Sequence, residues 1–334
     1  MAVTNERTDT ADMKNIYIAA CAPDGGVYLC DFENEKLSVR AFYPFENPMF
    51  LAKSGNKMYI ELRKTDGDYS GILECDIAKD GTLSNFGAPV STKGVVACHL
   101  CVHDSDIYCV NYLSGSVSRI RNGVCDKLDV HTGHGPNPKR QEAAHTHYIN
   151  VTPDGKYLVS TDLGLDTVYV YDFDLGVHST AKVPDGHGCR HVVFNHEGTR
   201  MYCVNELTST VTVFTYSDGT LEPLGTYPAL PPDYDGVSTA AAIRISDDGK
   251  YLYVSNRGHD SITCFEITAS DTLEVRSYTP CGGKRPRDFD IKDGYLFSTN
   301  EETNDVTVFR CDGPKLTLLD TKIDAKGALC VIFG

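Results

Sequence analysis

Residues 143–171 read AAHTHYINVTPDGKYLVSTDLGLDTVYVY. The stretch divides into three short strand-like runs, 149–152, 157–161 and 167–171, and the first of its turns is Pro153-Asp154-Gly155. Runs of β-branched and aromatic residues that are bounded by Asp and Gly turns are typical of an antiparallel meander. The same unit recurs along the chain, so this stretch predicts the architecture of the whole protein.

Seven copies of the second and third strands of this unit can be aligned along the chain. The starts of the third strands recur roughly every 45 residues, with longer intervals near 50, and this period is typical of a β-propeller. The sequence therefore predicts an all-β, seven-bladed β-propeller with four antiparallel strands per blade. The predicted second strands are 16–20, 58–62, 107–111, 157–161, 201–205, 251–255 and 295–299, and the predicted third strands are 27–32, 71–77, 116–121, 167–171, 210–215, 261–267 and 305–310.

An innermost strand precedes six of the seven second strands. The unit that begins at Ile16 has none before it, and the apolar stretch Ala328–Phe333 remains unassigned at the other end of the chain. We expect this C-terminal strand to complete the first blade and close the ring, which removes an open sheet edge. The prediction is one domain over residues 15–334, preceded by a disordered segment over residues 1–14. The six inner strands are 49–53, 98–102, 147–151, 190–195, 241–245 and 287–291.

Composition limits the classes of function. The 334 residues carry a net charge of -15, which argues against a nucleic-acid partner. No apolar run approaches the length of a membrane span, and the polar start of the chain lacks the apolar core of a signal peptide. The thirteen cysteines lie mostly in apolar strands without zinc-binding spacing, which favours reduced thiols. We expect a cytoplasmic monomer without a cofactor or a membrane partner.

Blade geometry indicates where chemistry can occur. An inner strand starts on the face where its antiparallel neighbour ends, so these positions converge on one mouth of the central channel. In this acidic chain they are rich in arginine and histidine, which predicts a basic pocket. The starts of inner strands supply His99, His145, His147, Arg190, His191, Arg285 and Arg287, and the ends of second strands supply Arg63, Tyr112, Asp162, Glu206, Arg257 and Glu301.

Several of these residues also have structural interpretations. His131 and His134 precede the His145-x-His147 pair, but no carboxylate or cysteine spacing completes a recognised metal site, so we predict none. His147 could be an acid or base, or an ordinary strand-end histidine. A structural ion pair between Glu206 and Arg190 and a catalytic pair look alike in a sequence.

The chain resembles the seven-bladed propeller lactonase family, which contains the propeller-type 6-phosphogluconolactonases and the fungal carboxymuconate-lactonizing enzymes. The resemblance covers essentially the whole chain. Its most specific part joins residues 135–142, GPNPKRQE, to His147, to the turn at 153–155 and to residues 162–166, DLGLD. Two positions depart from the family pattern: Cys189 stands where proline is usual, and residues 238–242 are small and mostly apolar. Supporting pieces are 189–191, 205–207, 256–258 and 285–289.

The resemblance implies a set of active-site residues. It places the family's histidine on His147, its two arginines on Arg190 and Arg257, and its glutamate on Glu206. His145, His191, Asp162, Arg285 and Arg287 are expected to bind the substrate. Arg285, Arg287, Lys139 and Arg140 are the candidates for binding a phosphate.

The implied activity is metal-independent hydrolysis of a small anionic lactone, with 6-phosphogluconolactone first among the substrates. Either Glu206 or His147 could take the first proton from water. The same residues could also run a lactonase or cycloisomerase reaction on a carboxylated lactone such as a muconolactone. A non-catalytic interaction propeller is a further alternative, although the chain has no tryptophan and hence no Trp-Asp repeat. A calcium-dependent six-bladed lactonase does not fit seven repeats.

Overall fold

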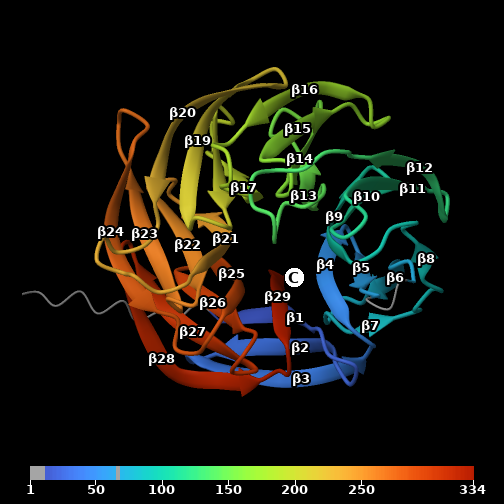
Figure 1. Cartoon of the computed structure of the whole chain (residues 1–334). Helices are drawn as coiled ribbons and strands as arrows, with labels where there is room; N and C mark the ends of the chain where they lie inside the picture. Colours follow the sequence, from blue (N-terminus) through green and yellow to red (C-terminus); the bar gives the residue numbers. More distant parts are fainter. Residues whose placement is uncertain (1–11, 65–67) are drawn as a thin grey trace, which may run out of the picture.

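The computed structural model describes residues 12–64 and 68–334, and within these ranges it contains strands and turns but no helix. The strands form seven antiparallel sheets arranged as blades around a central channel (Figure 1). The predicted seven-bladed propeller with four antiparallel strands per blade is therefore confirmed. Residues 1–11 of the predicted disordered segment lie outside the described residues, and the first strand already begins at Met13.

The strands of each blade run from the channel outwards. The inner strands are β29 (Ala328–Phe333), β4 (Pro48–Ser54), β9 (Ala97–His103), β13 (Thr146–Val151), β17 (Cys189–Phe194), β21 (Thr239–Ile245) and β25 (Pro286–Lys292). The second strands are β1 (Met13–Ala20), β5 (Lys57–Leu62), β10 (Asp106–Asn111), β14 (Leu158–Asp162), β18 (Arg200–Asn205), β22 (Tyr251–Arg257) and β26 (Tyr295–Asn300). The third strands are β2 (Gly26–Glu33), β6 (Gly71–Ile77), β11 (Ser116–Arg121), β15 (Thr167–Tyr171), β19 (Thr210–Ser217), β23 (Ser261–Ile267) and β27 (Asp305–Asp312).

The outermost strands are β3 (Lys36–Pro44), β12 (Val124–Val130), β16 (Val177–Lys182), β20 (Thr220–Pro228), β24 (Leu273–Pro280) and β28 (Lys315–Asp324). The second blade differs, because two short pieces, β7 (Leu83–Ser84) and β8 (Val90–Ser91), pair with different parts of β6.

The ring closes in its first blade. Strand β29 pairs antiparallel with β1, and the register runs from Ile16 opposite Phe333 to Ala20 opposite Ala328. The first blade thus has the order β29-β1-β2-β3, as the unassigned C-terminal stretch predicted. Because both strands find a partner, neither presents a free row of backbone donors and acceptors to solvent.

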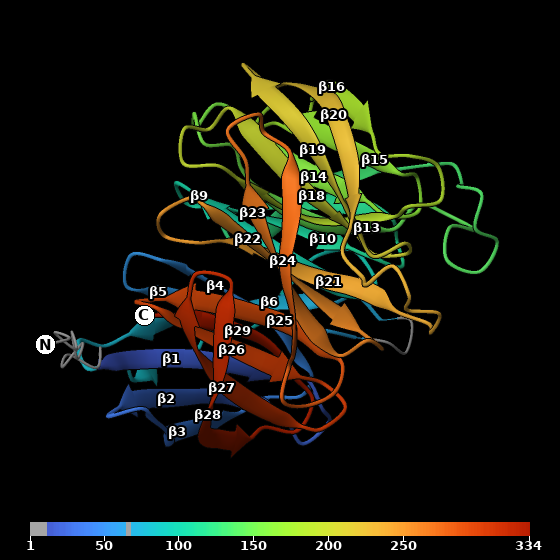
Figure 2. The same ribbon diagram turned by 90° about the vertical axis from the view of Figure 1, so that its left-hand side faces the viewer.

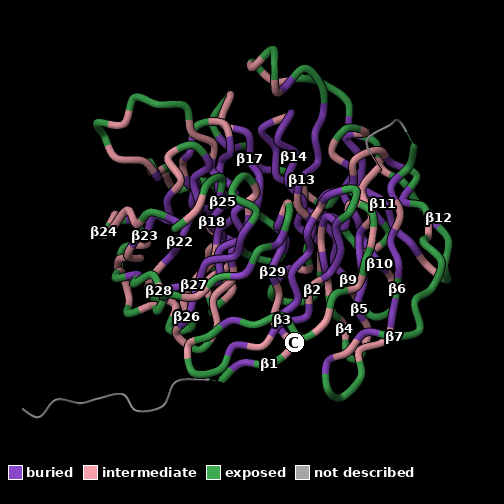
Figure 3. Tube along the Cα trace, turned by 90° about the horizontal axis from the view of Figure 1, so that it is seen from below, coloured by how far each residue is buried: buried purple, intermediate pink, exposed green. Residues whose placement is uncertain are grey.

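Burial is greatest in the second strands and least in the outermost strands at the rim (Figure 3). Every residue of β14 is buried, because neighbouring blades cover both of its faces. The outermost β20 alternates between buried and exposed positions only at its start and is largely exposed beyond it. Second strands therefore read as continuous apolar runs, whereas rim strands are richer in polar residues.

The buried apolar residues of the described chain form seven clusters, one at each interface between neighbouring blades. The cluster between the seventh and first blades joins Phe32 to Phe297, whose rings meet edge to face with centroids 5.3 Å apart. Each fully buried side chain of this size contributes about 1.5–3 kcal/mol through burial of apolar surface. The hydrophobic core of this protein is therefore divided among the seven interfaces between blades and is not one central cluster.

The two faces of the propeller differ, because every inner strand begins on one face and ends on the other. The described ends of the chain lie on one face, and the long loop between β12 and β13, drawn in green, projects from the other (Figure 2). That second face is where the inner strands begin.

Among the described residues no helix is long and apolar enough to cross a membrane. All thirteen cysteines are free thiols, and only Cys21 and Cys311 are not fully buried.

Candidate active site

A pocket of about 590 Å³ opens at the mouth where the inner strands begin. Six of the seven blades, or the loops that follow them, contribute to its lining. The charged side chains of the lining comprise five arginines and one carboxylate, and His147 lies beside them: Arg63, Arg140, Arg257, Arg285, Arg287 and Glu206. A chain with a net charge of -15 therefore gathers positive charge at this mouth, and the predicted basic pocket is present.

Backbone bulges place the inner-strand residues of this pocket. In β13 the pairing with β14 shifts register between Thr146 and Tyr148, so that His147 is the extra residue. Because a bulge re-aims the side chain that it carries, this position can differ from a regular alternating strand. The corresponding shifts in β4, β9, β17 and β25 fall at Met49, Cys98, Arg190 and Arg287.

Glu206 is the centre of the ion-pair network in the pocket. It follows β18 directly and is 4% exposed. Arg140 donates from Nη2 to Oε1 at 2.6 Å, Arg190 donates from Nε to Oε2 at 2.9 Å, and Nη2 of Arg257 lies 3.0 Å from Oε2. Both carboxylate oxygens are therefore occupied by guanidinium groups that come from three different parts of the chain.

The charges of this network keep Glu206 ionised. Burial alone would raise its pKa, but the positive charges of Arg257 and Arg190 outweigh burial and hold the pKa well below its ordinary range. Burial lowers the pKa of Arg190 to about 9, which still leaves the guanidinium protonated at neutral pH. A carboxylate so firmly ionised is a poor proton acceptor, so Glu206 is better suited to orient the arginines around it.

His147 is buried at the base of the pocket, and its Nδ1 has no hydrogen-bond partner among the described residues. Burial and the positive charge of Arg190 hold the pKa of His147 well below its ordinary range. The imidazole is therefore neutral at physiological pH and keeps a nitrogen lone pair. Its ring meets the edges of Tyr112 and His191, with centroids 5.7 and 5.3 Å away.

Two of the expected substrate ligands lie in the wall behind the pocket. Both ring nitrogens of His145 are engaged, Nδ1 with the carbonyl of Tyr112 at 3.0 Å and Nε2 with Glu142 at 3.1 Å. Asp162 is fully buried and accepts hydrogen bonds from the backbone of His145 and Leu165. Neither side chain is part of the pocket lining, and their contacts place both in the wall behind it.

Two other predicted residues lie below the pocket lining. Arg190 is 2% exposed and donates from Nη1 to the carbonyl of Ala241 at 2.7 Å in addition to its bond with Glu206. His191 lies deeper in the channel against His99 and Tyr148, with ring centroids 5.3 Å away in both cases. Arg190 therefore positions Glu206, and His191 supports the ring of His147.

The remaining predicted residues do line the pocket, together with others that were not in the predicted site. His147, Glu206, Arg257, Arg285 and Arg287 are all part of the lining. Arg63 and Tyr112, which the strand ends had already placed at the mouth, line the pocket too, and so does Arg140. Sequence reasoning missed lining residues that lie in loops or at the start of β21, among them Leu113, Val237 and Thr239.

Buried polar atoms without a hydrogen-bond partner concentrate around this channel. Buried polar groups in proteins are normally paired, so such a concentration indicates a place where ligand or water is bound. Within the described chain, seven of the eleven atoms of this kind belong to residues that line the mouth or the strands directly below it: Arg63 Nε, His147 Nδ1, His191 Nε2, Arg287 Nε, Glu301 Oε2 and both carboxyl oxygens of Glu61.

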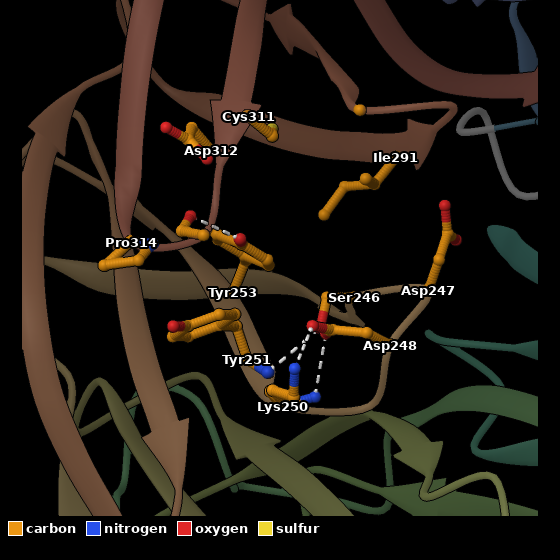
Figure 4. Close-up of a pocket in the computed structure, with 12 residues that line it drawn as sticks. Ser246, Asp247, Asp248, Lys250, Tyr251, Tyr253, Ile291, Cys311, Asp312 and Pro314 are labelled. Carbon is orange, nitrogen blue, oxygen red and sulfur yellow. Dashed lines mark hydrogen bonds and ion pairs between the residues drawn. The ribbon is translucent and has the colours of Figure 1, made fainter. Parts of the chain in front are cut away.

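A second cavity of about 470 Å³ lies between the sixth and seventh blades on the opposite face (Figure 4). Some of its polar groups bond to one another. Asp248 accepts hydrogen bonds from the hydroxyl of Ser246 and the backbone of Lys250, and the hydroxyl of Tyr253 donates to the carbonyl of Gly313. The first two contacts stabilise a turn, and the third joins the sixth and seventh blades. In residues 12–64 and 68–334 no group of three or more His, Cys, Asp or Glu side chains is placed to hold a metal ion.

Comparison with known proteins agrees with this geometry. Residues 15–333 match the family described as lactonase, 7-bladed beta-propeller, and the chain belongs to this family. An uncharacterized protein of Staphylococcus aureus is 33% identical, and the match covers 96% of this chain and 100% of the relative.

Solved structures give the same result. The crystal structure of a "putative 6-phosphogluconolactonase" from Bacteroides fragilis superimposes with a TM-score of 0.89 at 27% identity, over 98% of this chain and 99% of that chain. A protein from Lactobacillus plantarum superimposes with a TM-score of 0.89 at 29% identity, over 96% of this chain and 100% of that chain.

Proposed function

We propose that this protein is a lactonase that hydrolyses 6-phosphogluconolactone to 6-phosphogluconate without a metal ion. Membership of the lactonase family and the likeness to the Bacteroides fragilis structure support the reaction class. The observation that carries the proposal is the composition of the mouth, where five arginines and one glutamate surround a buried neutral histidine. This surplus of positive charge suits a substrate that is anionic before the reaction and gains a carboxylate during it.

The first step is attack of water on the lactone carbonyl. A ring nitrogen of His147, which lines the pocket, accepts a proton from this water, and the oxygen forms a bond to the carbonyl carbon. The resulting imidazolium lies in the field of Glu206, whose negative charge favours the protonated ring. His147 thus acts as the base, although burial makes it a weak one in the absence of substrate.

The second requirement is stabilisation of the tetrahedral oxyanion. Arg257 lines the pocket, and its Nη2 already lies 3.0 Å from both Glu206 Oε2 and the carbonyl of Ala240, so the guanidinium is held in one orientation. A fixed guanidinium stabilises developing negative charge without reorganisation. Arg140 lies on the other oxygen of Glu206 and supports the same charge.

The reaction ends with ring opening. The bond between the carbonyl carbon and the ring oxygen breaks, and the leaving alkoxide takes the proton that His147 removed from water. The product is a hydroxy acid, which ionises to a carboxylate beside the arginines. Glu206 and Arg190 take no part in proton transfer in this scheme, because they hold the orientation of Arg257 and Arg140.

The test is hydrolysis of freshly generated 6-phosphogluconolactone, coupled to 6-phosphogluconate dehydrogenase, in the presence of EDTA. We expect turnover by the wild type and a loss of roughly 10²–10⁴-fold in His147→Gln. His196→Gln is the matched control, since His196 is exposed in the turn after β17. Turnover that matches the spontaneous rate would remove this substrate, and unphosphorylated lactones and muconolactones would then be assayed.

A further inference from the structure

Two further arginines of the pocket come from blades other than those of Glu206 and Arg257. Arg63 follows β5 in the second blade and Arg287 lies in β25 of the seventh, whereas Glu206 and Arg257 belong to the fifth and sixth blades. Arg63 and Arg287 line the same pocket as Glu206 and Arg257. Burial, and to a smaller extent the positive charge of Arg287, lower the pKa of Arg257, so the arginines of neighbouring blades share one electrostatic environment.

The Nε donors of these two arginines are not used by the protein. The Nε atoms of Arg63 and Arg287 are both buried and have no hydrogen-bond partner in the described part of the chain. A buried guanidinium donor without a partner is costly, because it has lost its hydration and gained nothing in exchange. Two such donors in one pocket indicate that a ligand supplies the missing acceptors.

Nearby carboxylates form no hydrogen bond to the pair. Glu301 Oε2 forms ion pairs with Nη1 of Arg287 at 3.6 Å and with Nε of Arg285 at 3.8 Å, but it accepts no hydrogen bond, so the donors of these arginines stay available. Glu61 is fully buried near Arg63, and burial raises its pKa well above the ordinary range, so it stays uncharged. None of the ion pairs within residues 12–64 and 68–334 includes Arg63.

The arginines of the Glu206 side are not available for the same purpose. Arg140 is bound to Glu206, and exposed Lys139 is not part of the pocket lining, so the phosphate role considered for them from the sequence has little support. Arg285 remains available at the rim, where its side chain is 44% exposed. The guanidinium donors of the mouth that have no hydrogen-bond acceptor therefore lie in the second and seventh blades.

We propose that Arg63 and Arg287, with Arg285 at the rim, form an anion subsite for a phosphate group that the substrate carries away from its lactone ring. The inference rests on the proposed lactonase function and adds the orientation of its substrate. The lactone carbonyl faces His147 and Arg257, and the phosphate lies on the side of the second and seventh blades, where planar guanidinium groups can bind its oxygens in a bidentate manner.

The first test compares two lactones that differ only in the phosphate. Wild type, Arg63→Gln and Arg287→Gln are assayed with 6-phosphogluconolactone and with D-glucono-1,5-lactone. We expect the ratio of kcat/KM for the phosphorylated lactone to that for the unphosphorylated lactone to fall at least 10-fold in each variant, mainly through KM. Arg276→Gln is the matched control, because Arg276 pairs with Glu266 at the outer rim of the sixth blade.

A second test uses binding, and it does not depend on turnover. Calorimetric titration with inorganic phosphate and with 6-phosphogluconate should show binding to the wild type that weakens at least 10-fold in Arg63→Gln and in Arg287→Gln. Arg63→Lys keeps the charge but not the bidentate geometry, so its affinity for phosphate should lie between those of the wild type and Arg63→Gln. Thermal unfolding of each variant verifies that the propeller is folded.

The outcomes separate the two proposals. A wild type that hydrolyses neither lactone but binds phosphate through Arg63 and Arg287 would refute the lactonase and retain the anion subsite. An equal loss of kcat/KM on both lactones, or unchanged phosphate binding in both variants, would overturn the subsite. If the subsite is overturned in this way, hydrolysis of 6-phosphogluconolactone by the wild type would still support the lactonase function.

Discussion

Arg190 lies beneath Glu206, and its Nε donates a 2.9 Å hydrogen bond to Oε2 while the two side chains are only 2% and 5% exposed. The pair joins two strands of the fifth blade, because Arg190 is on the bulge of β17 and Glu206 follows β18. A buried pair of this kind is weak evidence for net stability, but removal of one partner leaves an uncompensated charge. Its value to the protein is the fixed orientation of Glu206.

Replacement of the buried arginine should be costly. We expect Arg190→Met to lower the free energy of unfolding by about 3–5 kcal/mol, because Glu206 then keeps only Arg140 and Arg257. Urea denaturation measures this change. Arg276→Met at the outer rim is the control and should change stability by less than about 0.5 kcal/mol. A loss below about 1 kcal/mol in Arg190→Met would mean that the pair is dispensable.

The three channel histidines predict sensitivity to acid. Burial, with nearby positive charge, holds the pKa values of His99, His147 and His191 well below the ordinary range. Below about pH 6.5 the unfolded chain protonates these groups and the folded protein does not, so unfolding takes up protons and stability falls as pH decreases. Each such group contributes a slope of up to about 1.4 kcal/mol per pH unit.

Urea denaturation between pH 5 and pH 8 checks this slope. In His191→Phe the slope below about pH 6 should decrease by about 1.4 kcal/mol per pH unit, because one proton fewer is taken up. The exposed His196→Gln should leave the slope unchanged. If His191→Phe has the same pH profile as the wild type, the imidazole of His191 does not stay neutral in the folded protein.

Glu61 should have the opposite effect on the pH dependence of stability from that of the histidines. It is fully buried, both of its carboxyl oxygens lack a hydrogen-bond partner, and burial raises its pKa well above the ordinary range. Above about pH 4.5 the unfolded chain loses this proton while the folded protein retains it, so stability declines as pH rises towards the folded-state pKa. Glu61→Met removes the titrating group at similar volume. The gain in the free energy of unfolding of Glu61→Met over the wild type should be larger at pH 8 than at pH 5. A gain that is the same at both pH values would contradict this prediction.

Ring closure can be tested by truncation. Removal of β29, residues 328–334, would leave β1 with an unpaired edge and expose the apolar cluster that contains Ile18 and Val331. We expect loss of a cooperative unfolding transition and association of the truncated chain through this edge. Calorimetry and size-exclusion chromatography would show both effects. A monomeric truncated chain that still unfolds cooperatively would show that the other six blades close without it.

Much of the fold could be predicted from sequence because its signal repeats. A single run such as 157–161 is ambiguous, but seven runs in the same order fix the number of blades, and the unpaired second strand at Ile16 identifies Ala328–Phe333 as its partner. The same logic locates the mouth, because it requires only the direction of each strand. It correctly brings His147, Glu206 and Arg257 to one pocket.

The depth of each side chain could not be predicted. Simple alternation places His145 and His147 on the same face, but the bulge at His147 separates them, and His145 packs flat on Tyr112 with ring centroids 4.4 Å apart. Likewise, nothing in the pattern reveals that Arg190 lies under Glu206 and not beside it. Such bulges depend on how the seven blades fit around the channel, which is a property of the whole ring.

The pairing of β1 with β29 has a mechanical consequence. The two strands are antiparallel neighbours, and Ile16 lies opposite Phe333, so the start of one and the end of the other are adjacent (Figure 2). A force that pulls these two points apart acts on one backbone hydrogen bond at a time, as in a zipper, and does not load the whole pair in shear. Under tension from its ends this ring would therefore open at its seam under a small load, long before the blades themselves unravel.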